Sequence, residues 1–293
     1  MSRPDGKAIQ AFFSFDAGIC GSAFIDLALK TGEKRFKEGA ELAGSFLNSM
    51  QNKDGSFSAV HVLTEGSDSP VMEEWFTDRC VLHGKNAIAL VKLWQLTGHE
   101  QWHESACRTL DWICSIQGLR GEFPHRQGAL LSMTHTHCYA TEGLLYAGLV
   151  MDNDRYLTAG IRGAEWLRVA QQRSGAFHRD YKTQGNGLPK ASNQSIFHVG
   201  PVAQAVRIWW VASRISPGRH WAEAAARSLG FLSKIQILDK NSIFYGAFPQ
   251  SVRFFGIRPR QKNTHYSPWE AMFAYEAARL WTTGKDEPAS SIF

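Results

Sequence analysis

The chain has 293 residues, of which 44% are hydrophobic, so it is long enough to bury a large core as one domain or two small ones. The net charge is +5, but lysine and arginine alternate with aspartate and glutamate, and no basic block of the kind that binds nucleic acid is present. Ten tryptophans and 18 phenylalanines suit a large aromatic core, an aromatic-lined cleft, or both.

The cysteines and the first residues bear on the cellular compartment. The five cysteines are odd in number and irregularly spaced, which argues against a secreted disulfide framework. The opening MSRPDGKAIQ lacks the apolar stretch of a signal peptide, and no apolar run reaches the length of a membrane span. We therefore expect a cytoplasmic protein that binds neither nucleic acid nor the membrane interior.

Four segments align with one another without gaps, at residues 35–51, 101–117, 155–171 and 220–236. Each has an aromatic residue near its start and another ten positions later, and each ends on glutamine, as Phe36, Phe46 and Gln51 do in the first. Aromatic and small residues at helical spacing predict amphipathic helices. A Gly-x-Phe sequence follows each segment, and its glycine suits a reversal with positive φ.

A second set of helices is expected ahead of these segments, at 15–32, 78–98, 136–151 and 195–215, with a fifth at 265–284 that has no partner after it. These stretches are apolar on most faces, so we expect them inside a ring whose outer layer is the aligned set. Residues 1–293 are thus predicted to form one all-α domain, an α/α toroid of about five inner and four outer helices. Either the ring is incomplete, or the segment before Asp16 together with a partner chain or a second copy helps to complete it.

Polar residues at the starts of the inner helices mark the expected mouth of the ring. Helix N-termini favour anions, which suits a substrate carboxylate. Capping and solvent exposure alone would explain about half of these residues. The candidates are Asp16, Glu73, Glu74, Asp78, Arg79, His83, His135, His137, Tyr139, Glu142, Asn193, Gln194, His198, Gln204, His265, Tyr266, Trp269 and Glu270.

Asp78 is the first candidate for a general acid or base, because desolvation in a cleft would raise its pKa. Its second carboxylate would be Glu73, Glu74 or Glu142, since glycosidases need a pair about 5–10 Å apart. The alternative is an ion pair between Asp78 and Arg79 that steadies the start of the helix.

The stretch THTHCYATEGLLYAG, residues 134–148, is unusually rich in polar side chains. His135, Tyr139 and Glu142 lie four and three positions apart, which brings them close to one helix face. The alternative pocket face holds His137 and Thr141. A histidine and a tyrosine in the mouth suit proton abstraction beside the carboxylate of a uronate, and equally the positioning of a sugar.

The loop 175–190 is rich in glycine and polar residues. It either covers the mouth, with side chains that reach the substrate, or is an ordinary connector. Its candidates for substrate contact are His178, Arg179, Asp180 and Tyr181.

The Thr-Gly openings before the outer segments, such as Thr31-Gly32 and Thr97-Gly98, and the helix-Gln-Gly-x-Phe endings resemble the six-hairpin glycosidase-like group. That group includes unsaturated glucuronyl hydrolases, sugar 2-epimerases and polysaccharide lyases. The resemblance implies an enzyme that acts on a uronate-containing or related saccharide by hydrolysis, elimination or epimerisation, without a required cofactor.

In this interpretation each candidate has a role. Asp78 and Glu142 would be acid/base carboxylates, and Arg79 would hold a substrate carboxylate. Proton transfer or positioning would fall to His135, His137, Tyr139 and Tyr266. Substrate contacts would come from Asp16, Glu74, His83, His198, Gln204, His265, Trp269 and Glu270.

A zinc-dependent transferase or cyclase is the alternative. Asp78-Arg79-Cys80 resembles the Asp-x-Cys of protein prenyltransferase β subunits, and residues 135–139 resemble their later histidine stretch with an offset of one. Zinc lanthionine cyclases use adjacent cysteine and histidine, here in reversed order at His137-Cys138. The resemblance implies a zinc site of Asp78, Cys80 and His137. A third hypothesis is a non-catalytic toroid that serves as a binding subunit.

Overall fold

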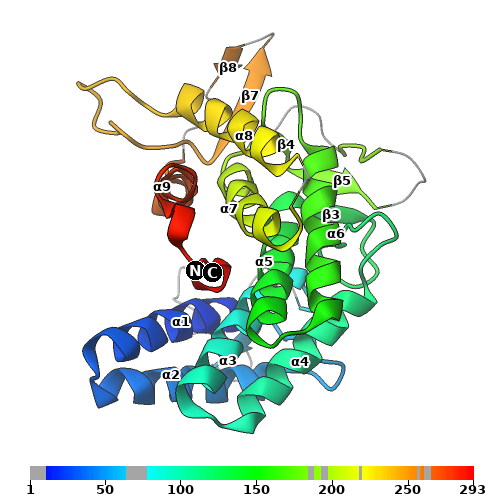
Figure 1. The fold of residues 1–293 in the computed structure, drawn as a ribbon, viewed down its shortest axis with the longest axis vertical. Coiled ribbons are helices and arrows are strands. Elements are labelled where there is room, and N and C mark those ends of the chain that lie inside the picture. The colour runs from blue at the N-terminus through cyan, green and yellow to red at the C-terminus, as the bar shows by residue number, and fades with distance from the viewer. Residues whose placement is uncertain are drawn as a thin grey trace.

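The computed structural model of the chain describes residues 11–63, 78–183, 188–192, 197–217, 220–255, 258–260 and 265–293. Within them, inner and outer helices alternate along the chain (Figure 1). The inner helices are α1 (Ser14–Thr31), α3 (Gly84–Thr97), α5 (Thr134–Val150), α7 (Gly200–Ile215) and α9 (Pro268–Thr282). The outer helices are α2 (Lys34–Met50), α4 (Glu100–Ser115), α6 (Asp154–Ala170) and α8 (Trp221–Ile235). The predicted all-α toroid is confirmed.

The helices form an arc of hairpins. Each inner helix packs against the next, in the order α1, α3, α5, α7, α9, and each outer helix packs against the inner helix before it. The central inner helices α5 and α7 are buried on nearly every face, whereas the outer helices bury one aromatic stripe, with Trp102, Trp166 and Trp221 in the core. In the described residues, α9 has no outer helix after it.

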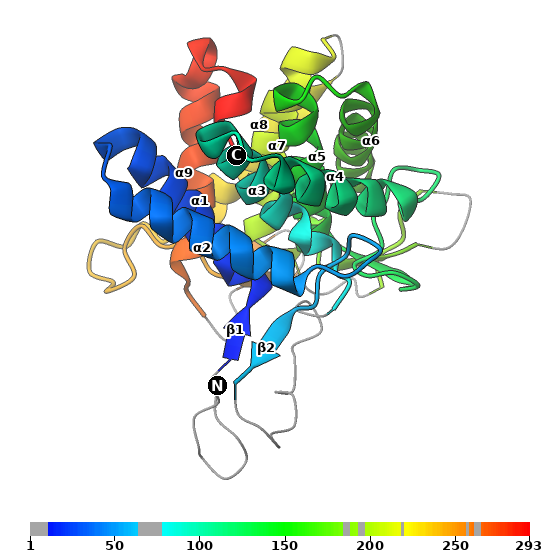
Figure 2. The ribbon, with the colours of Figure 1, turned by 90° about the horizontal axis from the view of Figure 1, so that it is seen from below.

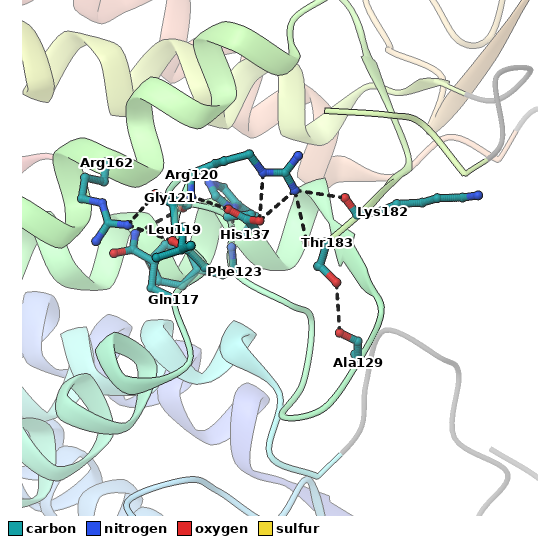
Figure 3. Close-up of polar contacts among 12 residues, drawn as sticks. Gln117, Leu119, Arg120, Gly121, Phe123, Ala129, His137, Arg162, Lys182 and Thr183 are labelled. Atoms are coloured by element: carbon teal, nitrogen blue, oxygen red, sulfur yellow. Dashed lines mark hydrogen bonds and ion pairs between the residues drawn. The ribbon is translucent and has the colours of Figure 1, made fainter. Parts of the chain in front are cut away.

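Each outer helix ends in a closure, by which we mean its final glutamine, the turn that follows and the glycine of the Gly-x-Phe sequence. The four closures are residues 51–55, 117–121, 171–175 and 236–246. In the second one Gln117 donates to the carbonyl oxygen of Gly121 at 3.2 Å (Figure 3). It also donates to the carbonyl oxygen of Ala159 on α6 at 2.9 Å. A closure therefore fixes its own turn and ties it to the next outer helix.

Short antiparallel strands and isolated bridges organise the loops that lead into the inner helices. β1 (Ala11–Phe13) pairs with β2 (Val60–Val62), and β3 (Leu131–Met133) pairs with β5 (Asp180–Lys182). A small sheet has the order β4 (Phe177–His178), β6 (Phe197–His198), β7 (Ser251–Phe255), β8 (Arg258–Arg260). Figure 2 shows β1 and β2 extending from one end of the helical array. The strands thus lie on the side where the inner helices begin.

Three inner helices begin later than their sequence pattern predicts. The helix expected over 78–98 begins at Gly84 after the short 3-10 helix η1 (Val81–His83), that over 195–215 at Gly200, and that over 265–284 at Pro268. The residues ahead of them are held in extended pairings, which a local pattern cannot reveal: Cys80 bridges to Arg126, and β6 pairs with β4 and β7. None of the described helices has the length and hydropathy that crossing a membrane requires.

Candidate active site

The starts of α5, α7 and α9 converge around Gly200. A methyl group added at Gly200 would lie 3.6 Å from Oε1 of Glu270 and 3.7 Å from Cε1 of His135. Ser267 caps α9 by accepting a hydrogen bond from the amide of Trp269, and its hydroxyl donates to Oε2 of Glu270. The cap therefore orients the Glu270 carboxylate so that Oε1 faces Gly200.

His135 forms the α5 side of this site. Its ring lies edge-on to that of Tyr139 at 4.7 Å, and the Tyr139 ring in turn meets Phe15 of α1 at 5.1 Å. Burial lowers the pKa of His135 to about 4, and the neighbouring Gln204 side chain acts in the opposite direction. His135 is consequently neutral at pH 7.

His198 stands beside His135 at the end of β6. Burial lowers the pKa of His198 to about 4, and the charges of His135 and Arg179 act in the same direction. The site therefore holds two neutral imidazoles at pH 7, and a neutral imidazole carries one nitrogen that can accept a proton.

Gln204 lies one turn into α7 and is fully buried. It lies beside His135, yet neither its amide oxygen nor its amide nitrogen makes a hydrogen bond of good geometry within the described residues. A buried amide without partners costs free energy, so this position suits a polar group of a substrate or an ordered water.

Beneath these residues lies a cluster of four charged side chains, which we call the buried charge cluster. Lys85, Glu142 and Arg207 are largely or fully buried, and Glu276 is partly exposed. The Glu142 side chain is fully buried, with Oε1 3.5 Å from Nη1 of Arg207 and Oε2 3.9 Å from Nζ of Lys85. Nε of Arg207 lies 3.1 Å from Oε2 of Glu276. Burial lowers the pKa of Lys85 to about 8, although Glu142 opposes the shift. Glu142, expected as an acid/base carboxylate, is thus held between two cations.

The last described residues pack against Arg207. Its guanidinium lies 5.3 Å from the ring centre of Phe273 and 5.4 Å from that of Phe293, and Nη2 donates to the carbonyl oxygen of Ile292 at 3.0 Å. The short helix η3 (Ala289–Ser291) leads this tail back against α5 and α7. The tail therefore covers one side of the buried charge cluster.

Asp78 and Arg79 do not form the ion pair that was the alternative to catalysis. Both are exposed; Oδ1 of Asp78 accepts the amide of Ala59 at 2.7 Å, and Nη1 of Arg79 lies 3.4 Å from Oδ2 of Asp54. That expectation was wrong because Arg79 adopts a positive φ of 54°, in a turn that places it beside Asp54.

His137, on α5, faces α6 through Gly163 and Trp166, and Figure 3 shows it beside Phe123. Its Nδ1 accepts the amide of Phe123 at 3.2 Å, its Nε2 lies 3.0 Å from the carbonyl oxygen of Gly163, and its ring packs on Trp166. Burial lowers the pKa of His137 to about 4. Both ring nitrogens are occupied by backbone groups, so the side chain has no free position for a metal.

The proposed zinc ligands do not assemble. Across the described ranges of the chain, no three side chains of histidine, cysteine, aspartate or glutamate come together in a way that could hold a metal ion. Cys80 is buried and Asp78 is exposed, and His137 faces another layer. The described residues therefore do not fit the zinc site that the prenyltransferase resemblance implied.

The other candidates are more scattered. Asp16 is exposed at the start of α1, with a pKa raised by partial burial. His83 is buried, with Nδ1 3.1 Å from Nδ2 of Asn86 and a pKa lowered by burial to about 3. The ring of Tyr266 stacks on Phe244 at 4.2 Å, and Trp269 is exposed, as is His265. Glu73, Glu74, Asn193 and Gln194 lie outside the described residues.

Sequence reasoning missed three charged residues of the buried charge cluster, Lys85, Arg207 and Glu276, and gave Arg179 only a conditional place. Arg207 interrupts an apolar inner helix, and a charge in such a helix is the signal that could have marked it. Lys85 follows Gly84 at the start of α3 and has no such local signal. The loop 175–190 does reach the site, because β5 pairs with β3 and Arg179 lies near His198.

No protein-family model and no curated protein matches the chain, but solved structures do. A cellobiose 2-epimerase from Bacillus thermoamylovorans has a TM-score of 0.72 at 14% identity, over 90% of this chain and 71% of that one. A sugar epimerase from a ruminal bacterium has a TM-score of 0.74 at 14% identity, over 96% and 75%. An unsaturated glucuronyl hydrolase from Bacillus sp. GL1 has a TM-score of 0.69 at 14% identity, over 92% and 74%. The chain therefore shares the α/α-toroid fold of these structures.

Proposed function

We propose that the protein is a saccharide-processing enzyme that moves a proton at the carbon next to a sugar carbonyl, and so epimerises or isomerises its substrate. The observation that carries this proposal is a pair of imidazoles that are neutral at pH 7: His135, which lies 3.7 Å from a Cβ placed on Gly200, and His198, whose neighbours include His135. Proton abstraction from carbon needs a neutral base close to the substrate, and this pair supplies two.

The chemistry follows from the groups around the pair. One imidazole takes the proton from the carbon, the C–H electron pair forms the C=C bond of an enediolate, and the carbonyl oxygen takes the negative charge. Gln204 donates a hydrogen bond to that oxygen, and the Glu270 carboxylate stabilises the imidazolium. A proton returned to the other face of the same carbon re-forms the carbonyl and gives the epimer. A proton returned to the neighbouring carbon, with the hydroxyl proton of the first carbon transferred to the former carbonyl oxygen, gives the isomer.

The structural neighbours support this reaction class without establishing it. The cellobiose 2-epimerase, the sugar epimerase and a D-mannose isomerase have this fold at 14% identity. A shared fold alone does not fix a reaction, so the argument depends on the residues at the mouth.

Isotope exchange tests the proposal. The protein is incubated with cellobiose, glucose or mannose in D₂O, and deuterium at C2 is followed by proton NMR. We expect exchange, reduced about 10²–10⁴-fold by His135→Asn and by His198→Asn because a proton-transfer group is lost. His220→Asn, an exposed histidine on the outer layer, is the control and should retain full exchange. Turnover of these sugars without deuterium incorporation would contradict the mechanism.

A uronate is the second candidate substrate, because Arg179 lies near His198. Elimination from a uronate starts with the same proton abstraction, next to a carboxylate that an arginine can bind. Asp16, whose raised pKa keeps it protonated to higher pH, would protonate the leaving oxygen. Ultraviolet absorbance of an unsaturated product, with KM raised by Arg179→Gln for uronates but not for neutral sugars, would favour this substrate.

A further inference from the structure

The first three closures are bound in the same way by the next outer helix. The glutamine of each donates to a carbonyl oxygen of that helix, on Ser105, Ala159 and Ala224 respectively. Three residues later in that helix comes an arginine. Its carbonyl oxygen lies so close to the glycine of the closure that a Cβ atom on this glycine would clash with it. The pairs are Gly55 with Arg108, Gly121 with Arg162 and Gly175 with Arg227.

The arginine side chains complete the contact. Nη2 of Arg108 donates to Oε1 of Gln51 at 2.6 Å, and Nε of Arg227 donates to Oε1 of Gln171 at 2.9 Å. Arg162 instead donates to the carbonyl oxygens of Gly118 and Leu119 in the turn (Figure 3). A small residue followed three positions later by arginine is therefore the feature that docks an outer helix on a closure.

The first outer helix supports this assignment. Within the described residues, which begin at Ala11, no closure contacts α2, and the position aligned with the three arginines is Leu42, whose residue surface is 72% exposed. Among the described outer helices, the three that bind a closure carry the arginine and α2 does not.

The fourth closure has the same internal form but no helix on it. Gly246 has a φ of 85°, and Gln236 donates to its carbonyl oxygen at 3.1 Å. Within the described part of the chain, a Cβ added at Gly246 would meet no atom within 4 Å, in contrast to the first three closures. The surface that would bind an outer helix is therefore formed, and no described residue covers it at Gly246.

The helix beside this closure is also uncovered. An outer helix that binds a closure packs on the inner helix before it, as α8 packs on α7. On α9, Met272 is 40% and Tyr275 68% exposed, while α7 is buried on most of its faces. The helix α8, whose end carries the fourth closure, contacts α9, so in the described residues an uncovered closure and a helix with exposed apolar side chains belong to neighbouring elements.

We propose that this position is a docking site for a single amphipathic helix of a partner protein. The helix carries an apolar stripe that packs on Met272 and Tyr275, and a small residue followed three positions later by an arginine that binds Gln236. The interface continues the one that the chain forms three times within itself. The α2 helix of a second copy does not fit this position. Within its own chain α2 packs on α1, and α1 would then have to lie where α9 lies. In addition, α2 has Leu42 at the position of the arginine.

The chain contains its own probe for this site. A fluorescent peptide of residues 220–236, the α8 sequence that binds the third closure, is titrated with the full-length protein and followed by anisotropy. We expect saturable binding that Tyr275→Glu abolishes. Arg227→Ala in the peptide should weaken binding about tenfold, because an arginine-to-amide hydrogen bond is lost. The unchanged peptide and the Arg227→Ala peptide should bind equally to Gln236→Ala protein, since Gln236 is the residue that accepts the hydrogen bond from the peptide arginine.

The control is Leu119→Glu, which changes a fully exposed leucine in the second, covered closure and should leave peptide binding unchanged. The proposal is overturned if the peptide does not bind, or if binding is the same in Tyr275→Glu and Gln236→Ala as in the unchanged protein. Circular dichroism of each variant separates loss of the site from loss of the fold.

Discussion

Arg207 connects more of the interior than any other charged side chain described here. Its guanidinium contacts Glu142, Glu276, two aromatic rings and the backbone of the tail, and it is 3% exposed. A buried ion pair adds little net stability when intact, but removal of one partner leaves an uncompensated buried charge.

We therefore expect Arg207→Met to lower the free energy of unfolding by about 3–5 kcal/mol. Adding Glu142→Gln should restore part of the loss, because the unpaired carboxylate is then absent. Urea unfolding of the two single variants and the double variant measures this coupling. If the effects of the two changes are simply additive, Glu142 and Arg207 do not interact as the structure indicates.

Helical spacing predicted which residues of 134–148 share a face. His135 and Tyr139 are in contact on one side, and His137 and Thr141 lie toward α6 on the other, because four positions make about one turn of helix. Spacing could not show that both nitrogens of His137 bind backbone, since Phe123 and Gly163 are distant in sequence. The choice between the two faces therefore needed the tertiary structure.

At the level of the element, the closures allow a matched comparison of two glycines. Gly175 and Gly246 both have positive φ, but Gly175 lies against the backbone of Arg227 and Gly246 faces open space within the described residues. Gly246→Ala should cost about 1–2 kcal/mol, which is the penalty of the left-handed conformation alone. Gly175→Ala should cost clearly more, because α8 must also move.

Urea unfolding of both variants checks this difference. Equal losses would show that α8 does not press on the third closure.

The outer helices themselves were predicted to within one residue or so at most ends, because their pattern is local and repeated. The inner helices were predicted less well at their starts, where pairing with distant strands decides where the helix begins.

For the molecule as a whole, buried histidines make stability depend on pH. Burial lowers the pKa of His135, His137 and His198 to about 4 and that of His83 to about 3, from an ordinary value near 6.5. Between pH 6.5 and 4 the unfolded chain binds protons that the folded chain does not. Stability should be full above pH 6.5 and should fall through this window, by up to about 1.4 kcal/mol per pH unit for each histidine.

Urea midpoints at pH 7, 6, 5 and 4 test this expectation. His137→Gln should reduce the dependence of the urea midpoint on pH by the contribution of one histidine. His220→Gln, which changes an exposed histidine at the start of α8, should leave that dependence unchanged. A midpoint that stays constant over this range would mean that these histidines are not buried as described.

The ring itself was predictable because the repeat occurs four times, and repeated hairpins must stack to bury their apolar faces. The contacts that the C-terminal tail makes with the helices were not predictable. The tail reaches Arg207 across 85 positions of sequence, and nothing in its own residues indicates that contact.

The closures also make the dependence of one outer helix on another run in one direction along the chain. Each of the first three holds the end of one outer helix by means of the next, so we expect later outer helices to stabilise earlier ones, as in a one-dimensional array whose units depend on a neighbour on one side. Within the described residues no helix binds the fourth closure, so we expect the end of α8, and α9, to open locally at a lower free energy than the helices before them. Glu270 stands on α9, whereas His135 and Gln204 stand on helices held from both sides. One wall of the mouth can therefore open toward solvent while the two imidazoles keep their positions.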